Sequence, residues 1–413
     1  MIARRGLLAA GLGLPFVARA AASARIVVVG ASFGGAAVAR ALHAADASLA
    51  ITLVEREPSI STGPGTNSAI AGLRLIDNIR FPWQGIPGIT TRLGEAVAVD
   101  PVARKLTLRD GAVLEYDRLV LAPGVDIAWN ALPGYTEAAA ERMPHAWKGE
   151  AQTVLLREQL LAMDDGGTVI VTVSDNPIRC PIAPYERASL IAHYLKTYKP
   201  KSKLLILDAK EHFSNQANFQ AAWVRLYPGL LEWIGLPDGG RVIQVDVTAM
   251  KVATEFDDHI CTVGNIIPPQ RAAAIAHAAG VADRTGWCPV NPATFESTLV
   301  PGIHVIGDAI IGGAMPKAAY AAAEQARACA AAIVAALSGK PFAPRPLTNI
   351  CYAIAAPAYG FSTRGAYLPK DGLLTEIEGT GQSSPPDAAP RVRSKEAADG
   401  DTWFNNITDA SFA

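Results

Sequence analysis

The sequence is poor in net charge and in cysteine. Its 413 residues hold 37 Lys and Arg against 38 Asp and Glu, which gives a formal net charge of −1. We therefore expect neither a basic face for nucleic acid nor an acidic solvating tail. Only 5 cysteines occur, and the first of them is Cys180. The string C-x-x-C-H is absent from the sequence, so any c-type haem must be held by another chain.

A long apolar run is also missing. The most apolar early stretch, residues 6–17, is shorter than the roughly 20 residues that a membrane-spanning helix needs. It follows Arg4 and Arg5 and precedes the small residues A-R-A at 18–20. These features are typical of a secretory signal, and the paired arginines favour the twin-arginine route. We predict an export signal over residues 1–24 and a periplasmic protein without a membrane span; a buried first helix is the alternative.

A dinucleotide-binding pattern follows this signal. The string RIVVVGASFGGAAVARAL, residues 25–42, predicts a buried strand, a tight glycine turn and a helix, and ITLVERE, residues 51–57, predicts a second strand. Gly30 permits the turn, Gly35 permits close packing of helix on strand, and Glu55 stands where a ribose hydroxyl would bind. Ser32 replaces the middle glycine of G-x-G-x-x-G, so it either crowds a pyrophosphate at the helix N-terminus or donates its hydroxyl to it.

Two later strings complete this first domain. YDRLVLAPGVD, residues 116–126, predicts a strand and a Pro-Gly turn, and GIHVIGDA, residues 302–309, predicts a strand that ends at Gly307 and Asp308. Their order is typical of flavoproteins with two dinucleotide domains. We therefore predict an α/β fold with two Rossmann-like, glutathione-reductase-like domains and a C-terminal α+β domain. The expected boundaries are residues 25–132 and 271–341 for a discontinuous FAD-binding domain, 133–270 for the second domain, and 342–413 for a flavin-interface or partner domain. Within the last of these, residues 379–399 are rich in Gly, Ser, Pro and charge and predict a loop.

The second Rossmann-like domain lacks glycine where a nucleotide would need it. GGTVIVTVSD, residues 166–175, and SKLLILDAK, residues 202–210, predict two of its strands. The turn after the first strand reads VSDNPIRCPIAPYERA, residues 173–188, and holds no glycine. Its prolines remove N–H donors that would cradle a pyrophosphate. We therefore expect a degenerate NAD fold and electrons that do not come from NAD(P)H.

The five cysteines differ in their surroundings. Cys329 lies in an alanine-rich helix, Cys261 beside a core strand, and Cys288 in a segment that suggests structural packing. Cys180 and Cys351 lie at or near irregular, proline-containing backbone, which makes them the best candidate pair by elimination, although sequence alone does not give the pairing. A bridge between them is either a structural staple or a redox disulfide beside a flavin.

Several rare strings together resemble one known family. They are RCPIAPYERAS, NIIPPQRAA, GWCPV, TFES, MPKAAYAA, CYAIAAPAYG and WFNNI, spread over the mature chain. The chain resembles the flavoprotein subunit of flavocytochrome c sulfide dehydrogenase and the related flavoprotein of periplasmic sulfur-oxidation systems. The resemblance implies a redox-active disulfide between Cys180 and Cys351 over an FAD, with Glu186 as the active-site acid or base. Taken on its own, Glu186 is instead a carboxylate that the dipole of a helix start favours.

The resemblance also implies which residues contact FAD. Lys317 corresponds to a cation that faces the cofactor, with a solvated surface lysine as the alternative. Trp403 corresponds to an aromatic residue near the flavin, with a core anchor as the alternative. No metal site is predicted. The remaining predicted FAD contacts are Gly30, Ser32, Gly34, Gly35, Glu55, Arg56, Asn67, Ala122, Gly124, Gly307 and Asp308.

One position departs from this family. Its best-known members bond a cysteine, in a T-C-x-x-S/T-N segment, to the flavin. Here Thr62, Thr66 and Asn67 keep that frame, and Gly63 takes the place of the cysteine. Because no thiol precedes Cys180, a cysteinyl bond cannot form at this loop. We therefore predict that FAD is held without a covalent bond.

The implied function is oxidation of sulfide to sulfur or polysulfide, with electrons passed through FAD to a c-type cytochrome subunit or a soluble acceptor. The expected substrate is hydrosulfide, which attacks the disulfide and leaves a persulfide and a thiolate. Two alternatives stay open. One is an NAD(P)H-dependent disulfide or quinone oxidoreductase, and the other is a related flavoprotein that acts on another sulfur compound or has no turnover of its own.

Overall fold

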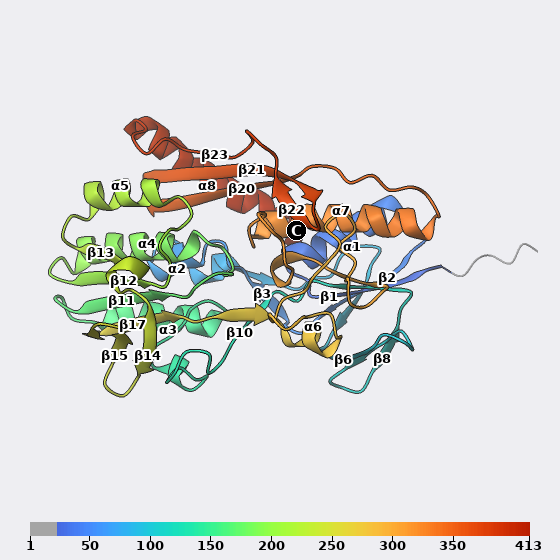
Figure 1. Ribbon diagram of the computed structural model, residues 1–413, viewed down its shortest axis with the longest axis horizontal. Coiled ribbons are helices and arrows are strands. Elements are labelled where there is room, and N and C mark those ends of the chain that lie inside the picture. The colour runs from blue at the N-terminus through green and yellow to red at the C-terminus, as the bar shows by residue number, and fades with distance from the viewer. Residues whose placement is uncertain (1–22) are drawn as a thin grey trace, which may run out of the picture.

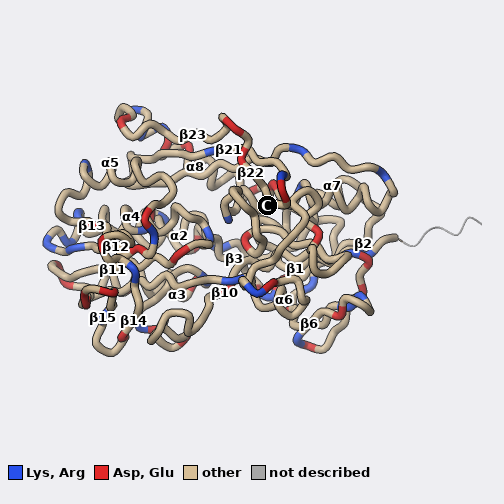
Figure 2. The backbone as a smooth tube through the Cα atoms, in the orientation of Figure 1, with Lys and Arg blue, Asp and Glu red and all other residues tan. Residues whose placement is uncertain are grey.

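Three sheet-based units make up the described part of the chain (Figure 1). The computed structural model describes residues 23–413, so the predicted export signal lies outside the described residues apart from its last two positions. Within the described part, no helix is both long and apolar enough to cross a membrane. In Figure 2, lysines and arginines are interspersed with acidic residues along the tube, as expected for a chain with a formal net charge of −1.

The first unit is built on a parallel sheet of five strands in the order β19-β9-β1-β2-β5. The last four residues of the β1 sequence RIVVV are buried, and β1 pairs in parallel with both β2 and β9. Because β19 follows the second unit in the sequence, residues 25–121 and 303–305 supply this sheet jointly. The strands are β1 (Arg25–Val29), β2 (Ala50–Glu55), β5 (Thr90–Leu93), β9 (Arg118–Leu121) and β19 (Ile303–Val305).

Two long helices, α1 (Phe33–Ala45) and α7 (Ala319–Leu337), pack against each other in the first unit. Both are rich in alanine, so they approach closely and bury most of their contact faces. Smaller elements complete the unit. They are β3 (Ser59–Ser61), α2 (Thr66–Ile70), η1 (Ile76–Ile79), β4 (Arg80–Pro82), β6 (Ala96–Asp100), β7 (Lys105–Leu108), β8 (Val113–Glu115), α6 (Ala274–Ala278) and η4 (Gly307–Ala309).

The passage from β1 into α1 depends on two glycines. Gly30 has a φ of +92°, and a Cβ on it would lie 2.5 Å from the carbonyl oxygen of Ala122. A Cβ on Gly35 would lie 1.6 Å from the carbonyl oxygen of Gly30. The turn therefore admits no side chain at either position, and this allows α1 to begin only four residues after β1 ends.

The second unit has a parallel sheet of four strands in the order β13-β12-β11-β17. An aromatic cluster covers it: Tyr185 stacks on Phe213 with ring centroids 3.7 Å apart, and Phe219 packs against both rings. The sheet and its helices comprise η2 (Ala139–Glu141), α3 (Glu150–Ala162), β11 (Thr168–Val173), α4 (Ala183–Tyr198), β12 (Lys203–Asp208), α5 (Gln216–Leu226), β13 (Leu231–Ile234) and β17 (Val263–Ile267). The unit also has the short helix η3 (Leu236–Asp238). Antiparallel strands are β14 (Val242–Asp246), β15 (Lys251–Thr254), β16 (Asp258–Ile260), and the pair β10 (Val125–Ile127) and β18 (Gln270–Ala272).

The third unit is an antiparallel sheet with a long C-terminal helix. Strands β20 (Leu347–Ala356), β21 (Tyr359–Lys370) and β22 (Leu373–Glu376) lie in that order, and β23 (Gln382–Ser383) pairs with β21. Helix α8 (Pro390–Phe412) packs on β20 and β21. The predicted α/β fold class, with two Rossmann-like units and a C-terminal α+β unit, is thus confirmed.

Two local expectations were wrong. The composition of residues 379–399 predicts a loop, yet α8 begins at Pro390. A proline at the first helical position removes no intrahelical hydrogen bond, and the Arg, Lys, Glu and Ala residues that follow favour helix. Cys351 lies within the regular strand β20 rather than on irregular backbone. The neighbouring prolines Pro346 and Pro357 flank that strand and do not interrupt it.

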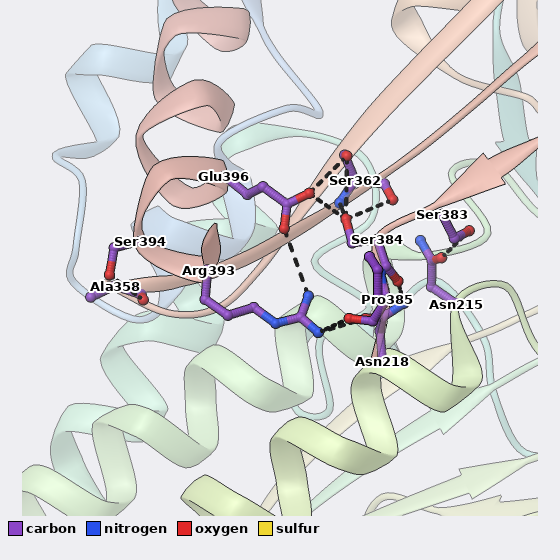
Figure 3. A network of polar contacts seen from close by, with 10 residues as sticks. All are labelled: Asn215, Asn218, Ala358, Ser362, Ser383, Ser384, Pro385, Arg393, Ser394 and Glu396. Carbon is purple, nitrogen blue, oxygen red and sulfur yellow. Dashed lines mark hydrogen bonds and ion pairs between the residues drawn. The ribbon is translucent and has the colours of Figure 1, made fainter. Parts of the chain in front are cut away.

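A buried polar network fastens α8 to the rest of the chain (Figure 3). Arg393 is 1% exposed, and its Nη2 donates to Asn218 Oδ1 of α5 at 3.0 Å and to the Pro385 carbonyl at 2.5 Å. The Glu396 carboxylate accepts from the Ser362 hydroxyl of β21 at 3.1 Å. Because these partners belong to different units, the network fixes where the first turns of α8 lie.

Gly35→Ala should destabilise the protein, whereas Gly34→Ala should not. At Gly34 a Cβ would meet nothing closer than 3.5 Å, in contrast to the 1.6 Å approach at Gly35. We expect Gly35→Ala to cost about 3 kcal/mol through overpacking. Gly34→Ala should be neutral or slightly stabilising, because alanine favours helix. Urea unfolding midpoints measure both effects, and equal midpoints would contradict the close approach in this turn.

Candidate cofactor and thiol site

A cavity of about 660 Å³ lies where the three units meet. Small-molecule sites commonly have volumes of roughly 300–1,000 Å³. Gly35 does not line the cavity, because it packs against the carbonyl of Gly30 instead. The other predicted site residues all line it: Gly30, Ser32, Gly34, Glu55, Arg56, Asn67, Ala122, Gly124, Cys180, Glu186, Gly307, Asp308, Lys317, Cys351 and Trp403.

One part of the cavity wall is formed by the start of α1 and the end of β2. Ser32 is the N-cap residue of α1, but its side chain makes no capping hydrogen bond. Its hydroxyl is therefore available beside the free N–H groups of the first helical turn. The Glu55 carboxylate accepts from the backbone N–H groups of Ala31 at 2.7 Å and Arg56 at 2.8 Å, which fixes its position. This part of the wall fits a pyrophosphate and a ribose hydroxyl.

Four buried polar atoms of residues in the wall have no hydrogen-bond partner within residues 23–413. They are Arg74 Nε, Trp147 Nε1, Asp308 Oδ1 and Trp403 Nε1. Buried polar groups in folded proteins are nearly always hydrogen-bonded, so an unpaired acceptor and three unpaired donors around a cavity of this size indicate a polar ligand. Burial raises the pKa of Asp308, and the nearby Arg179 and Lys317 oppose that rise. The residues present therefore fit a dinucleotide cofactor such as FAD.

The Lys317 ammonium is fixed in this wall. Its Nζ donates to the carbonyl oxygens of Asp308 at 2.9 Å and Ile310 at 2.5 Å, and it lies 4.0 Å from the ring centroid of Trp287. Burial lowers the pKa of Lys317 to about 8, and Asp308 acts in the opposite direction. The group is thus a positioned cation beside any occupant of the cavity.

Cys180 and Cys351 reach the same wall from different units. Cys180 lies between β11 and α4 with a φ of +49°, and its N–H donates to the Lys317 carbonyl at 2.7 Å. Cys351 is 9% exposed in β20, and its Sγ accepts from Asn349 Nδ2 at 3.4 Å. Both are free thiols in the structure, so the disulfide stays a prediction.

Burial governs the acidity of these two thiols. It raises the pKa of Cys351 to about 11, although the hydrogen bond from Asn349 acts against the rise. Burial also raises the pKa of Cys180, and the neighbouring Cys351 and Glu186 raise it further. Of the two sulfurs, Cys351 therefore has the more favourable surroundings for a thiolate.

Glu186 is held by donors from two other units. Its Oε2 accepts from Asn67 Nδ2 at 2.7 Å, and its Oε1 accepts from the Ile354 N–H at 3.0 Å. Burial raises the pKa of Glu186, and both hydrogen bonds oppose that rise. Asn67 also donates to the Ala183 carbonyl at 3.0 Å, so both of its N–H groups are used within the protein. Its contribution to the site is to hold Glu186.

Arg187 anchors this network. It is 2% exposed, and it donates to Asn67 Oδ1 at 3.0 Å, Asn265 Oδ1 at 3.0 Å and the Ala146 carbonyl at 2.6 Å. Because Arg187 uses the amide oxygen of Asn67, the N–H groups of Asn67 must face Glu186. Burial lowers the pKa of Arg187 to about 9. The orientation of Glu186 thus depends on the buried cation of Arg187, to which it is linked through two hydrogen bonds of Asn67.

Sequence reasoning missed two arginines of this site, Arg187 and Arg179. A signal for Arg187 was present, since it lies four residues before Ile191 on the buried stripe of α4. Arg179 lines the cavity and lies 5.5 Å from the Trp147 ring centroid. A Cβ on Gly63 would lie 3.9 Å from its guanidinium. The sequence signal for Arg179 was its position directly before the candidate cysteine Cys180.

The second Rossmann-like unit has no open place for a nucleotide ribose at the end of β12. Asp208, the last residue of that strand, is 0% exposed. Its carboxylate accepts from the Tyr185 hydroxyl at 2.6 Å, from Trp233 Nε1 at 3.1 Å and from Lys210 Nζ at 2.8 Å. In a dinucleotide-binding unit an acid near this position binds the ribose. Here protein side chains use that carboxylate instead.

Three protein-family models match the chain. The central model of the flavocytochrome c sulfide dehydrogenase flavoprotein chain matches residues 153–268, and the flavocytochrome c sulphide dehydrogenase flavin-binding model matches residues 344–412. A pyridine nucleotide-disulphide oxidoreductase model matches residues 24–161. These matches support a flavin as the cofactor of the cavity.

Solved structures share the fold at low sequence identity. The sulfide:quinone oxidoreductase of the hyperthermophilic bacterium Aquifex aeolicus is 19% identical, with a TM-score of 0.74 over 94% of this chain and 92% of that one. A chain of the covalent putidaredoxin reductase–putidaredoxin complex is 17% identical, with a TM-score of 0.65 over 94% of each chain. A ferredoxin reductase from Rhodopseudomonas palustris is 16% identical, with a TM-score of 0.63 over 83% and 82%. At these identities the likeness shows the fold alone.

Arg187→Met should destabilise the protein strongly. Removing the guanidinium leaves the amide oxygens of Asn67 and Asn265 without their donor, and each buried acceptor left unpaired costs about 1–3 kcal/mol. Arg225→Met is the matched control, because Arg225 is exposed in the last turn of α5 and should change stability by less than about 0.5 kcal/mol. Urea unfolding measures both. Similar midpoints for the two variants would rule out the anchoring role of Arg187.

Proposed function

Because the chain belongs to the family of the flavocytochrome c sulfide dehydrogenase flavoprotein chain, we propose that it is a periplasmic, FAD-dependent sulfide dehydrogenase that passes electrons to a c-type cytochrome. As a member of this family, the chain is a flavin oxidoreductase. The observation that carries the proposal is that Cys180, Cys351 and Glu186 line one cofactor-sized cavity. Each of the three comes to that wall with fixed hydrogen-bond partners.

The chain's own residues would hold FAD. When bound, this cofactor supplies a two-electron acceptor that can release its electrons singly. Ser32 and the first turn of α1 would bind the pyrophosphate, Glu55 a ribose hydroxyl, and Asp308 a further hydroxyl. Lys317 places a positive charge in the wall. Because Gly63 has no side chain, these contacts would have to retain the cofactor without a covalent bond.

The two cysteines would receive the substrate as a disulfide. Hydrosulfide attacks one sulfur, the S–S bond breaks, and a persulfide forms on one cysteine while a thiolate leaves on the other. Charge is conserved in this step, because the anion that enters is replaced by the thiolate. The Asn349 N–H favours the thiolate at Cys351. Leaving-group acidity therefore supports attack at Cys180 with departure of Cys351.

Glu186 would manage the proton of this exchange. Its charge is close enough to raise the pKa of both thiols, and burial raises its own pKa above that of an ordinary glutamate. A carboxyl of this kind can hold a proton and deliver it to a neighbouring thiolate. Asn67 and the Ile354 N–H keep it in place while it does so.

The acceptor and the compartment complete the proposal. The sequence has no haem-attachment string, so a haem acceptor would belong to a separate cytochrome chain. The paired arginines Arg4 and Arg5, followed by a short apolar stretch, support export by the twin-arginine route. The occupied carboxylate of Asp208 weighs against NAD(P)H as the source of electrons.

Cys351→Ser should abolish reduction of the flavin by sulfide and leave FAD bound, because serine forms neither a disulfide nor a persulfide. Cys329→Ser is the control, since Cys329 is buried within α7. We expect anaerobic sulfide to bleach the flavin absorbance of the parent and of Cys329→Ser only. Bleaching of Cys351→Ser would defeat the disulfide mechanism, and bleaching of the parent by NADH would favour an NAD(P)H-dependent oxidoreductase.

Acid precipitation should release all FAD into the supernatant. Gly63→Cys tests the reason, because a Cβ there meets nothing closer than the Arg179 guanidinium at 3.9 Å, and a nearby cation favours the reactive thiolate. We expect part of the flavin to stay with the precipitated Gly63→Cys polypeptide. Flavin fluorescence of the supernatant and of the pellet measures how much FAD is released and how much stays with the polypeptide. Flavin in the pellet of the parent protein would show that another residue attaches it.

A further inference from the structure

A second, smaller cavity shares the two cysteines with the cofactor cavity. Its volume is about 150 Å³, and Cys180, Ile182, Ala318 and Cys351 line both cavities. The remaining residues of the small cavity do not touch the large one. They are Pro181, Ser214, Ala314, Pro316, Asn349, Thr363, Arg364 and Tyr367. The thiols therefore form part of a common wall, with a separate space on each side of it.

The outer part of the small cavity is exposed and carries a charge, whereas its inner part is buried and polar. Arg364 and Ser214 are exposed, whereas Asn349 is 3% and Tyr367 is 6% exposed. The Arg364 Nε donates to Gln382 Oε1 at 2.9 Å. This partner is a neutral amide, so the contact does not neutralise the charge of Arg364. An approaching anion would meet this cation before it reaches the thiols.

The buried part of the cavity offers hydrogen-bond donors to sulfur. Asn349 Nδ2 donates to Cys351 Sγ at 3.4 Å. Burial raises the pKa of Tyr367 to about 12, with Glu376 and Cys351 adding to the rise, so its hydroxyl keeps its proton at neutral pH. Among the described residues that line the cavity, none is acidic. Among the described residues of the lining, the one charged side chain is therefore the cation Arg364.

The volume limits which anion can enter. A cavity of about 150 Å³ is large enough for a molecule of the size of benzene. Hydrosulfide or a short chain of sulfur atoms fits this space.

We propose that the small cavity is the site through which inorganic sulfur anions, hydrosulfide and short polysulfide chains, reach and leave Cys180 and Cys351, and that Arg364 selects for their negative charge. This inference rests on the proposed function and deepens it. Substrate and cofactor would then meet the thiols from two separate cavities. The cofactor would not have to move for a sulfur chain to depart.

Alkylation of the flavin-loaded, thiol-reduced protein tests this site without any need for sulfide turnover. Iodoacetate and iodoacetamide have similar size, but only iodoacetate is an anion. We expect Arg364→Gln to lower the ratio of iodoacetate to iodoacetamide rate constants about threefold to fivefold, since one charge at a rim changes association modestly and in a salt-dependent way. Mass spectrometry should locate the label on Cys180 or Cys351.

Arg391→Gln is the matched control, because Arg391 is exposed on α8 and lines neither cavity. Its rate ratio should equal that of the parent. An unchanged ratio in Arg364→Gln, an equal fall in Arg391→Gln, or absence of label from both cysteines would each overturn the proposed site.

If the ratios behave as expected but sulfide does not bleach the parent flavin, the anion site stands and the sulfide dehydrogenase function fails. If sulfide bleaches the parent but Arg364→Gln leaves the ratio unchanged, the function stands and the site fails.

Discussion

The geometry of this protein depends on one buried guanidinium. Arg187 has almost no contact with water, so every one of its donors must find an acceptor within the protein. The acceptors come from separate places: the amide of Asn67 in the first unit, and Asn265 and the Ala146 carbonyl near the second sheet. The hydrogen bonds of this one cation therefore fix the position of the first unit relative to the second. The Asn67 side chain that accepts from Arg187 also donates to Glu186. The hydrogen bonds that the buried Arg187 charge requires therefore also set the position of the Glu186 carboxyl group.

The third unit adds the second sulfur to this frame. Strand β20 brings Cys351 to the wall and gives its Ile354 N–H to Glu186, while α8 brings Trp403 to the cofactor cavity. The two thiols then separate a large cavity from a small one. The large one has free donors and acceptors that suit a dinucleotide, and the small one has donors and a cation that suit a small anion. A dinucleotide in the large cavity and an anion in the small cavity can thus both reach the two thiols at the same time.

The sequence predicts those parts of the site that are encoded locally. The turn at Gly30, the strand end at Glu55 and the fold class follow from patterns within a few tens of residues. The strand around Cys351 and the start of α8 were missed, because nearby prolines and charged residues indicate loops unless their flanking position is known. The role of Arg187 and the small cavity at Arg364 depend on side chains that meet only after the units have assembled. No local pattern contains that information.

The order in which the chain is made has a consequence for loading of the cofactor. The first sheet includes β19, and the cavity wall includes Trp403 of α8, so the binding site is finished only after α8 has left the ribosome. Insertion of the flavin into the complete site therefore has to wait until α8 has folded onto the rest of the chain. A polypeptide truncated before α8 could form both Rossmann-like sheets and still lack one wall of its prosthetic-group pocket.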